Sequence, residues 1–210
     1  MLPPNFIRPC LPTPRKEPPA GGGWLHEIKF DGFRVQVHKH GRDVALFSRG
    51  GTEWSDRYPE ITAAIAKLPT RAVILDAELT ACDGDGWTNF SALLHRGHGH
   101  LCIWVFDILA QNGKDLRELP LASRRQKLDA LMARVRSDVI RYSEPFPDPL
   151  RLLAACAEHK LEGIVSKRVD RPYRSGESNS WIKVKCPEWR RANQWRHEFF
   201  ARSSARPTRG

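Results

Sequence analysis

The stretch EIKFDGFR, residues 27–34, holds one lysine between an apolar strand and a tight turn. In an extended strand, successive side chains point to opposite faces. Glu27 and Lys29 are therefore predicted to share one face. Ile28 and Phe30 are predicted on the other face, packed against the core. Taken alone, the stretch favours a hairpin with a solvated lysine, and a reactive amine at the lip of a cleft is the alternative.

A lysine acts as a nucleophile only when it is deprotonated, which requires burial or neighbouring cations that lower its pKa. Such cations occur much later in the chain, in the predicted strand 181–185. Lys183 and Lys185 lie two residues apart there, so they face the same way. We expect these two side chains to lower the pKa of Lys29.

Composition limits the class of protein. The chain has 210 residues, enough for one sizeable core, and a net charge of +10 that favours a polyanionic partner such as nucleic acid or a nucleoside triphosphate. No apolar run approaches a membrane span and no secretory signal opens the chain, so we expect a cytoplasmic protein. The five cysteines are scattered without a Cys-x-x-Cys pair, which predicts reduced thiols and argues against a zinc ribbon.

Three segments are predicted. Residues 1–20 are rich in proline, which is excluded from helix and sheet interiors, and are predicted to form an extended arm on the core. Residues 21–186 are predicted to form the folded domain. Residues 187–210 carry tryptophan and arginine and are predicted to form a basic helix with a disordered end, which docks on the core or contacts a nucleic-acid backbone.

Alternating apolar residues and helical spacing predict an α+β fold. Helices are predicted over residues 58–68, 121–135 and 149–159. Strands are predicted over residues 24–30, 33–39, 44–49, 72–80, 101–109, 139–142, 163–168 and 181–185, with a polar loop at 173–180. The strand 72–80 carries Asp76 and Glu78 on one face, which is costly unless a cation or hydroxyl meets them. Arg124, Arg125 and Lys127 on the helix 121–135 are predicted to form a solvated basic face.

In chain order, six short motifs resemble the nucleotidyltransferase motifs of ATP-dependent DNA ligases, a superfamily shared with RNA ligases and mRNA capping enzymes. The motifs are KFDGFR (29–34), SRGG (48–51), DAEL (76–79), FD (106–107), EGIVSK (162–167) and KVK (183–185). The flanking stretches WLHEIK, WSDRYP and SWIKVKC further resemble the ligase part of bacterial ligase D, the end-joining ligase.

This resemblance implies that residues 21–186 form a nucleotidyltransferase (adenylation) domain, a fold of antiparallel sheets flanked by helices with ATP in the groove between them. It implies that Lys29 attacks the α-phosphorus of ATP and becomes adenylated. The residues that the resemblance places around ATP are Glu27 near the adenine amine, Phe106 stacked on adenine, Arg34 and Arg49 on ribose and phosphates, Glu78 at the ribose or a metal-bound water, and Lys183 and Lys185 on the phosphates. Glu78 and Glu162 are expected to serve a divalent ion, Mg²⁺ or Mn²⁺, because a triphosphate and carboxylates suit hard cations.

The expected substrate is nicked or broken duplex DNA, in repair or end joining, and the expected protein is a monomer associated with the nucleoid. Ligases of this family continue after Lys-x-Lys into an OB-fold domain, and the residues after Lys185 are too few to form one. We therefore expect no OB-fold domain in this chain, and such a domain or end-joining proteins are potential partners in trans.

Two other functions remain open at this point. One is a nucleic-acid-binding module with limited catalysis, which the absent OB-fold favours. The other is RNA joining or guanylylation by the same chemistry, since the lysine alone does not choose between ATP and GTP.

Overall fold

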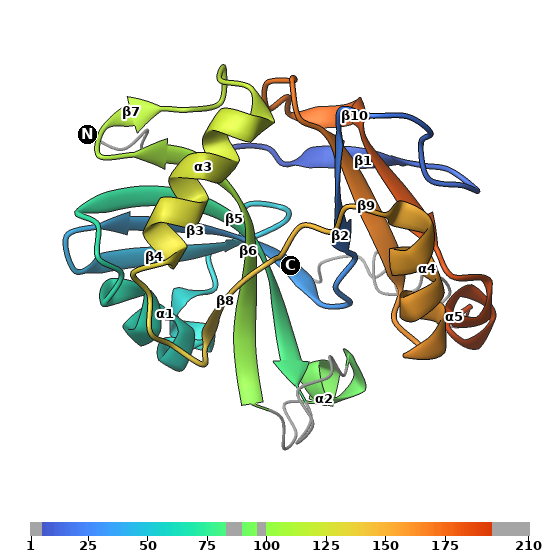
Figure 1. The fold of residues 1–210 in the computed structure, drawn as a ribbon. Helices are drawn as coiled ribbons and strands as arrows, with labels where there is room; N and C mark the ends of the chain where they lie inside the picture. The colour runs from blue at the N-terminus through green and yellow to red at the C-terminus, as the bar shows by residue number, and fades with distance from the viewer. Residues whose placement is uncertain (1–5, 83–89, 96–99, 195–210) are drawn as a thin grey trace, which may run out of the picture.

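Two β-sheets form the framework of the computed structural model, which describes residues 6–82, 90–95 and 100–194 (Figure 1). The larger sheet has the order β4 (Asp43–Ser48), β3 (Phe33–His40), β5 (Ala72–Cys82), β6 (His100–Gln111) and β7 (Lys114–Asp115), and β8 (Ile140–Tyr142) also pairs with β6. The smaller sheet has the order β1 (Cys10–Pro14), β10 (Gly176–Lys185), β9 (Gly163–Arg168) and β2 (Trp24–Ile28).

Most neighbouring strands are antiparallel, and the pairs β1–β10 and β6–β8 are parallel. The helices are η1 (Ser55–Arg57), α1 (Pro59–Ala66), α2 (Phe90–His95), α3 (Leu121–Met132), α4 (Pro149–Glu158) and α5 (Pro187–Ala192). α3 packs on β6 of the larger sheet, whereas α4 packs on β9 and β2 of the smaller one (Figure 1). The predicted α+β fold with sheets flanked by helices is confirmed.

The local sequence explains where the helices begin. α1, α4 and α5 each start with proline, whose fixed φ suits the first turn of a helix and whose missing N–H is not needed there. In α4 the Asp148 carboxylate also caps the helix by accepting hydrogen bonds from the backbone N–H groups of Leu150 and Arg151.

One apolar cluster joins the two sheets. It contains Ile7 and Cys10 from the N-terminal segment, Ile74, Phe106, Leu109 and Ala110 from the larger sheet, and Tyr173 and Trp181 from the chain around β10. Because these side chains pack against one another, the cluster fixes the distance between the two sheets where it lies.

The proline-rich arm contributes a strand. β1 pairs with β10 at the edge of the smaller sheet, a position that tolerates proline because its outer side needs no hydrogen bond. Two other predictions were wrong in detail. β10 starts at Gly176, inside the predicted polar loop. β2 ends at Ile28, so Phe30 stacks on Trp104, with ring centroids 4.3 Å apart, instead of packing in the core.

The last described helix, α5, covers the start of the predicted basic helix and has Arg190 and Arg191 in its last turn. The prediction for residues 195–210 lies outside the described residues. All five cysteines are free and buried. Within the described ranges, no helix has both the length and the apolar character that crossing a membrane requires.

Candidate active site

Lys29 lies where β2 ends and the chain turns toward the larger sheet. Its backbone N–H donates to the carbonyl of Gly163 in β9 at 2.8 Å, which continues the pairing of the two strands by one residue. Its Nζ donates to Oε2 of Glu162 at 2.7 Å. The side chain is 23% exposed, so the amine is held in place yet reachable from solvent.

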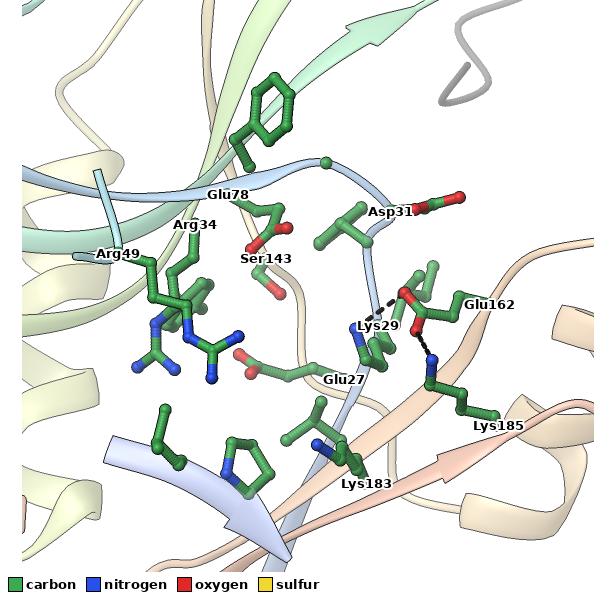
Figure 2. A pocket seen from close by; sticks show the side chains of 18 of the residues that line it. Glu27, Lys29, Asp31, Arg34, Arg49, Glu78, Ser143, Glu162, Lys183 and Lys185 are labelled. Atoms are coloured by element: carbon green, nitrogen blue, oxygen red, sulfur yellow. Dashed lines mark hydrogen bonds and ion pairs between the residues drawn. The ribbon is translucent and has the colours of Figure 1, made fainter. Parts of the chain in front are cut away.

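Glu162 joins two lysines. Its Oε1 accepts from Nζ of Lys185 at 2.8 Å, on the opposite side from Lys29 (Figure 2). The following Gly163 has φ +146°, and a Cβ there would lie 2.0 Å from the carbonyl oxygen of Val184. Only glycine therefore allows β9 to approach β10 closely enough to bring Glu162 between the two amines.

The electrostatics of Lys29 differ from the prediction. Burial disfavours the ammonium form, but the carboxylates of Glu162, Glu78 and Asp31 outweigh it, so the pKa of Lys29 is raised. The expectation that neighbouring lysines lower the pKa of Lys29 was wrong, because the carboxylates around the amine have the larger effect and Lys185 is itself paired with Glu162.

The pKa of Lys183 is shifted in the direction opposite to that of Lys29. Burial lowers its pKa, and the positive charges of Lys29, Lys185 and Arg49 lower it further. Among the described residues, Lys183 forms no ion pair. An anionic group bound between these cations would relieve their mutual repulsion.

Arg34 and Glu78 form the wall on the larger sheet, where they are paired across β3 and β5. Arg34 binds Asp76 through two parallel hydrogen bonds of 2.9 and 2.7 Å and donates to the carbonyl of Cys10 at 2.5 Å. The Asp76 carboxylate also accepts from the hydroxyl of Tyr173 at 2.7 Å. The prediction that a cation or hydroxyl meets the carboxylates of this strand is confirmed for Asp76.

Glu78 has a different environment. Burial raises its pKa to about 7, although the charges of Lys29 and Arg34 act in the opposite direction. The site therefore contains a carboxylate that is short of positive charge. A ribose hydroxyl or a hydrated cation would suit it.

Phe106 and Glu27 form the third wall. The Phe106 ring is 9% exposed and meets Trp181 edge-on at 6.1 Å between ring centroids. Glu27 is 2% exposed, and its two oxygens form ion pairs with Arg125 of α3 and Lys167 of β9.

These two walls, and the one formed by Lys29, Glu162 and the lysines of β10, enclose one cavity of about 580 Å³. All nine predicted site residues line it: Glu27, Lys29, Arg34, Arg49, Glu78, Phe106, Glu162, Lys183 and Lys185. Figure 2 labels all of them except Phe106. The volume falls within the range of pockets that hold ligands of nucleotide size. The cavity thus collects residues from both sheets that are far apart in sequence.

Sequence reasoning missed several residues of the site. Leu11 and Pro12 of the arm, Ser143 after β8 and Trp189 of α5 also line the cavity. Lys185 lies over the Trp189 ring at 4.6 Å from its centroid.

Arg124 and Arg125 were predicted to be solvated, but they are 0% and 4% exposed. A signal for their burial was present, because they lie three and four residues after the buried Leu121. Lys127 is exposed as predicted.

The carboxylates of the cavity fit a hard divalent cation. Mg²⁺ commonly takes one or two protein carboxylates and completes its shell with water and substrate phosphates. Glu78 offers such an oxygen ligand beside Lys29, and no larger cluster of metal-ligating side chains occurs within the described ranges. Each oxygen of Glu162 already accepts from one lysine, so a cation bound there would share this carboxylate with the two ammonium groups.

The chain belongs to the family of ATP-dependent DNA ligase domains, because residues 17–185 match the model of that family. A relative, the multifunctional non-homologous end joining protein LigD of Pseudomonas aeruginosa, is 37% identical over 201 residues, which cover 93% of this chain and 23% of the relative. A probable DNA ligase of Beutenbergia cavernae is 34% identical over 170 residues, covering 76% of this chain and 33% of the relative.

Solved structures agree with this assignment. Mycobacterial DNA ligase D complexed with ATP and MES matches with a TM-score of 0.75 at 28% identity, over 85% of this chain and 60% of that one. The DNA ligase-adenylate of Chlorella virus shares the fold, with a TM-score of 0.56 at 15% identity over 85% of this chain and 67% of that one. The chain spans about a quarter to a third of the length of the two sequence relatives named above.

Proposed function

We propose that this domain carries out the nucleotidyl transfer of an ATP-dependent DNA ligase. Lys29 takes AMP from ATP, and the AMP then passes to the 5′-phosphate of a DNA nick. The observation that carries the proposal is the single cavity in which the Lys29 amine lies beside Glu162, Glu78 and the cations of β10. Membership of the ligase domain family supports the same chemistry.

In the first step the lone pair of Lys29 Nζ attacks the α-phosphorus of ATP. A nitrogen–phosphorus bond forms, the bond from the α-phosphorus to the bridging oxygen breaks, and pyrophosphate leaves with the electron pair. The amine must lose a proton to solvent before or during the attack. The hydrogen bond to Glu162 aims Nζ, and Lys183 is the cation suited to the developing charge on the phosphate, since its own charge lacks an ion-pair partner among the described residues.

A divalent ion would offset the negative charge of the triphosphate when bound. We propose Glu78 as the residue that holds it or its water, with Glu162 as a second ligand. On the base side, Phe106 would stack against adenine and Glu27 would accept from its exocyclic amine. Arg34 and Arg49 would bind ribose and phosphates, which their planar donors suit.

Nicked DNA is the proposed acceptor of AMP. The net charge of +10 supports binding to its phosphate backbone. The resemblance to LigD, whose name states non-homologous end joining, supports a place in the repair of broken ends.

The two transfers can be tested separately. Incubation with ATP labelled on the α-phosphate and Mg²⁺ or Mn²⁺ should label the protein, and Lys29→Ala should remain unlabelled. Adding a nicked duplex with a 5′-phosphate should then move the label to DNA, whereas a duplex with a 5′-hydroxyl should not. A protein that binds nicked DNA but never acquires label would contradict the proposal and identify a binding module.

A further inference from the structure

A layer of buried charge lies on the Phe106 side of the cavity and consists of Arg125, which is outside the ligase motifs, and Lys167, the last residue of the motif EGIVSK. Arg125 of α3 is its centre. Its Nη1 donates to a carboxylate oxygen of Glu27 and to the carbonyl of Phe106 at 2.9 Å, and its Nη2 donates to the carbonyl of Ser143 at 2.6 Å. One guanidinium therefore ties together three parts of the cavity wall, which come from β2, β6 and the segment after β8.

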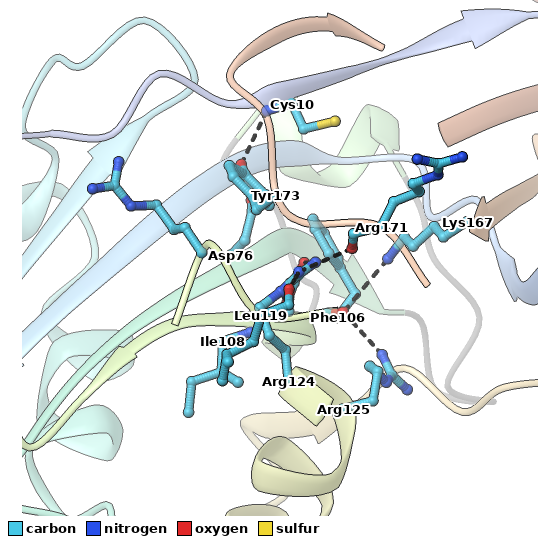
Figure 3. A network of polar contacts seen from close by, with 12 residues as sticks. Cys10, Asp76, Phe106, Ile108, Leu119, Arg124, Arg125, Lys167, Arg171 and Tyr173 are labelled. Atoms are coloured by element: carbon cyan, nitrogen blue, oxygen red, sulfur yellow. Dashed lines mark hydrogen bonds and ion pairs between the residues drawn. The ribbon is translucent and has the colours of Figure 1, made fainter. Parts of the chain in front are cut away.

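Lys167 completes the layer from β9. Its Nζ forms an ion pair with the second oxygen of Glu27 and lies 3.5 Å from the carbonyl of Phe106. It also lies 4.3 Å from the ring centroids of both Phe106 and Trp181. Figure 3 shows Arg125 and Lys167 meeting at the Phe106 carbonyl. Both side chains are almost fully buried, so their positions are fixed by packing.

These contacts determine what Glu27 offers to a ligand. Each of its oxygens already accepts from a cation, and a carboxylate has about four lone-pair positions in all. Glu27 also lines the cavity. It therefore presents fixed acceptors to the cavity and no donor.

We propose that Arg125 and Lys167 are positioning residues that set the nucleotide preference of the site through Glu27. A purine with an amine at position 6 can donate to this carboxylate. A purine with a carbonyl oxygen there would place acceptor against acceptor in a site shielded from water, which is strongly unfavourable. The inference rests on the proposed adenylation at Lys29, and it concerns the choice of base only.

The competing explanation is that the layer only stabilises the fold. The two explanations differ in one measurable quantity, the ratio of kcat/KM for adduct formation with ATP to that with inosine triphosphate. These nucleotides share the ribose and phosphates; inosine triphosphate has a carbonyl oxygen in place of the amine at position 6, and its N1 carries a proton that N1 of ATP lacks. A general loss of stability lowers both rates alike and leaves the ratio unchanged.

The variant Arg125→Lys keeps the charge but cannot span three acceptors. Its matched control is Arg124→Lys, the same change at the preceding residue of α3, which is equally buried but contacts Asp107, Leu119 and Arg171 instead of the cavity wall. A second variant, Lys167→Met, removes the other cation from Glu27. A third, Glu27→Gln, offers an amide donor to a carbonyl oxygen.

Wild type should favour ATP over inosine triphosphate by at least about 100-fold. Arg125→Lys and Lys167→Met should each lower this ratio by about 10-fold or more, mainly through a higher KM for ATP, while Arg124→Lys keeps it. Glu27→Gln should increase the use of inosine triphosphate. Thermal denaturation checks that each variant folds. One folded variant among those of Arg125, Lys167 and Glu27, called the wall variants, is enough for the test.

Two failures are distinguishable. If wild type forms no adduct with ATP, the proposed function fails and this inference fails with it. If wild type forms the adduct but the folded wall variants keep the wild-type ratio, or Arg124→Lys changes it as much as they do, only the positioning role is overturned.

Discussion

At the scale of single residues, Glu162 controls the reactivity of Lys29 in two opposing ways. It orients the amine through a hydrogen bond of 2.7 Å. Burial lowers the pKa of Lys29, but Glu162, Glu78 and Asp31 together raise it by more, so the net shift is upward. An ammonium group has no lone pair, so adduct formation is expected to speed up as the pH rises.

Glu162→Gln removes the negative charge and should move the pH profile of kcat/KM for adduct formation to lower pH. The maximum rate should fall by at least about 10-fold, because the hydrogen bond that orients the amine is weakened. The measurement is labelled-adduct formation across the pH range, with Glu177→Gln at an exposed position of β10 as the control. An unshifted profile in Glu162→Gln would refute the electrostatic link.

Glu78 makes a separate prediction about stability. Its pKa is about 7 in the folded state against an ordinary value of 4.5, so the folded state binds the proton more tightly than the unfolded state. The stabilisation from this proton is complete below about pH 4.5 and is lost as the pH rises through about 7.

Glu78→Gln imitates the protonated group at every pH. Without nucleotide, its free energy of unfolding should equal that of wild type at about pH 5. At about pH 8 it should exceed that of wild type by on the order of 2 kcal/mol, with a higher melting temperature. Calorimetry at both pH values measures the difference. A variant that is less stable than wild type at the higher pH would show that Glu78 has a cation partner in the folded state.

At the scale of elements, α3 is attached to the larger sheet by a buried ion pair. Arg124 binds Asp107 of β6 through two hydrogen bonds of 2.8 Å, and neither side chain is exposed. Breaking one partner of such a pair leaves an unpaired buried charge.

Asp107→Ala should therefore lower the free energy of unfolding by about 3–5 kcal/mol, measured by denaturant titration. The double variant Asp107→Leu with Arg124→Met should recover most of this loss, since no charge is left unpaired. Glu188→Ala, which breaks an exposed pair with Arg191, should change stability by less than about 1 kcal/mol. A double variant no more stable than the single one would contradict this account.

The elements also show what the sequence can predict. Motif residues such as Lys29 and Glu162 were found because six motifs, taken in order, resemble those of ATP-dependent DNA ligases, whereas the stretch around Lys29 alone favoured a solvated lysine. Arg125 was predicted to be exposed because of its residue type, although its spacing from Leu121 indicated burial, and its contact with Glu27, distant in sequence, could not be predicted. Strand β1 was not predicted because proline argues against a sheet, and only the parallel pairing with β10 reveals its edge position.

At the scale of the whole molecule, the excess of positive charge is expected to govern binding to DNA. Each phosphate neutralised by lysine or arginine releases a counterion, so affinity should fall steeply with salt. Truncation after Gln194 removes the arginine-rich end but keeps α5 and the cavity lining.

The truncated protein should retain self-adenylation and bind a nicked duplex more weakly, with a shallower dependence of the logarithm of affinity on the logarithm of salt concentration. Fluorescence anisotropy over a salt series provides the comparison, and labelled-adduct formation provides the control. Equal affinity and equal slope for the two proteins would assign DNA binding to the two-sheet body alone.

The most direct test is to find where AMP is attached. After incubation with ATP and Mg²⁺, intact-mass spectrometry should show the addition of one AMP per chain, and fragmentation of the digested protein should locate it on Lys29. An adduct on another lysine, or none on a folded wild-type protein, would contradict the account.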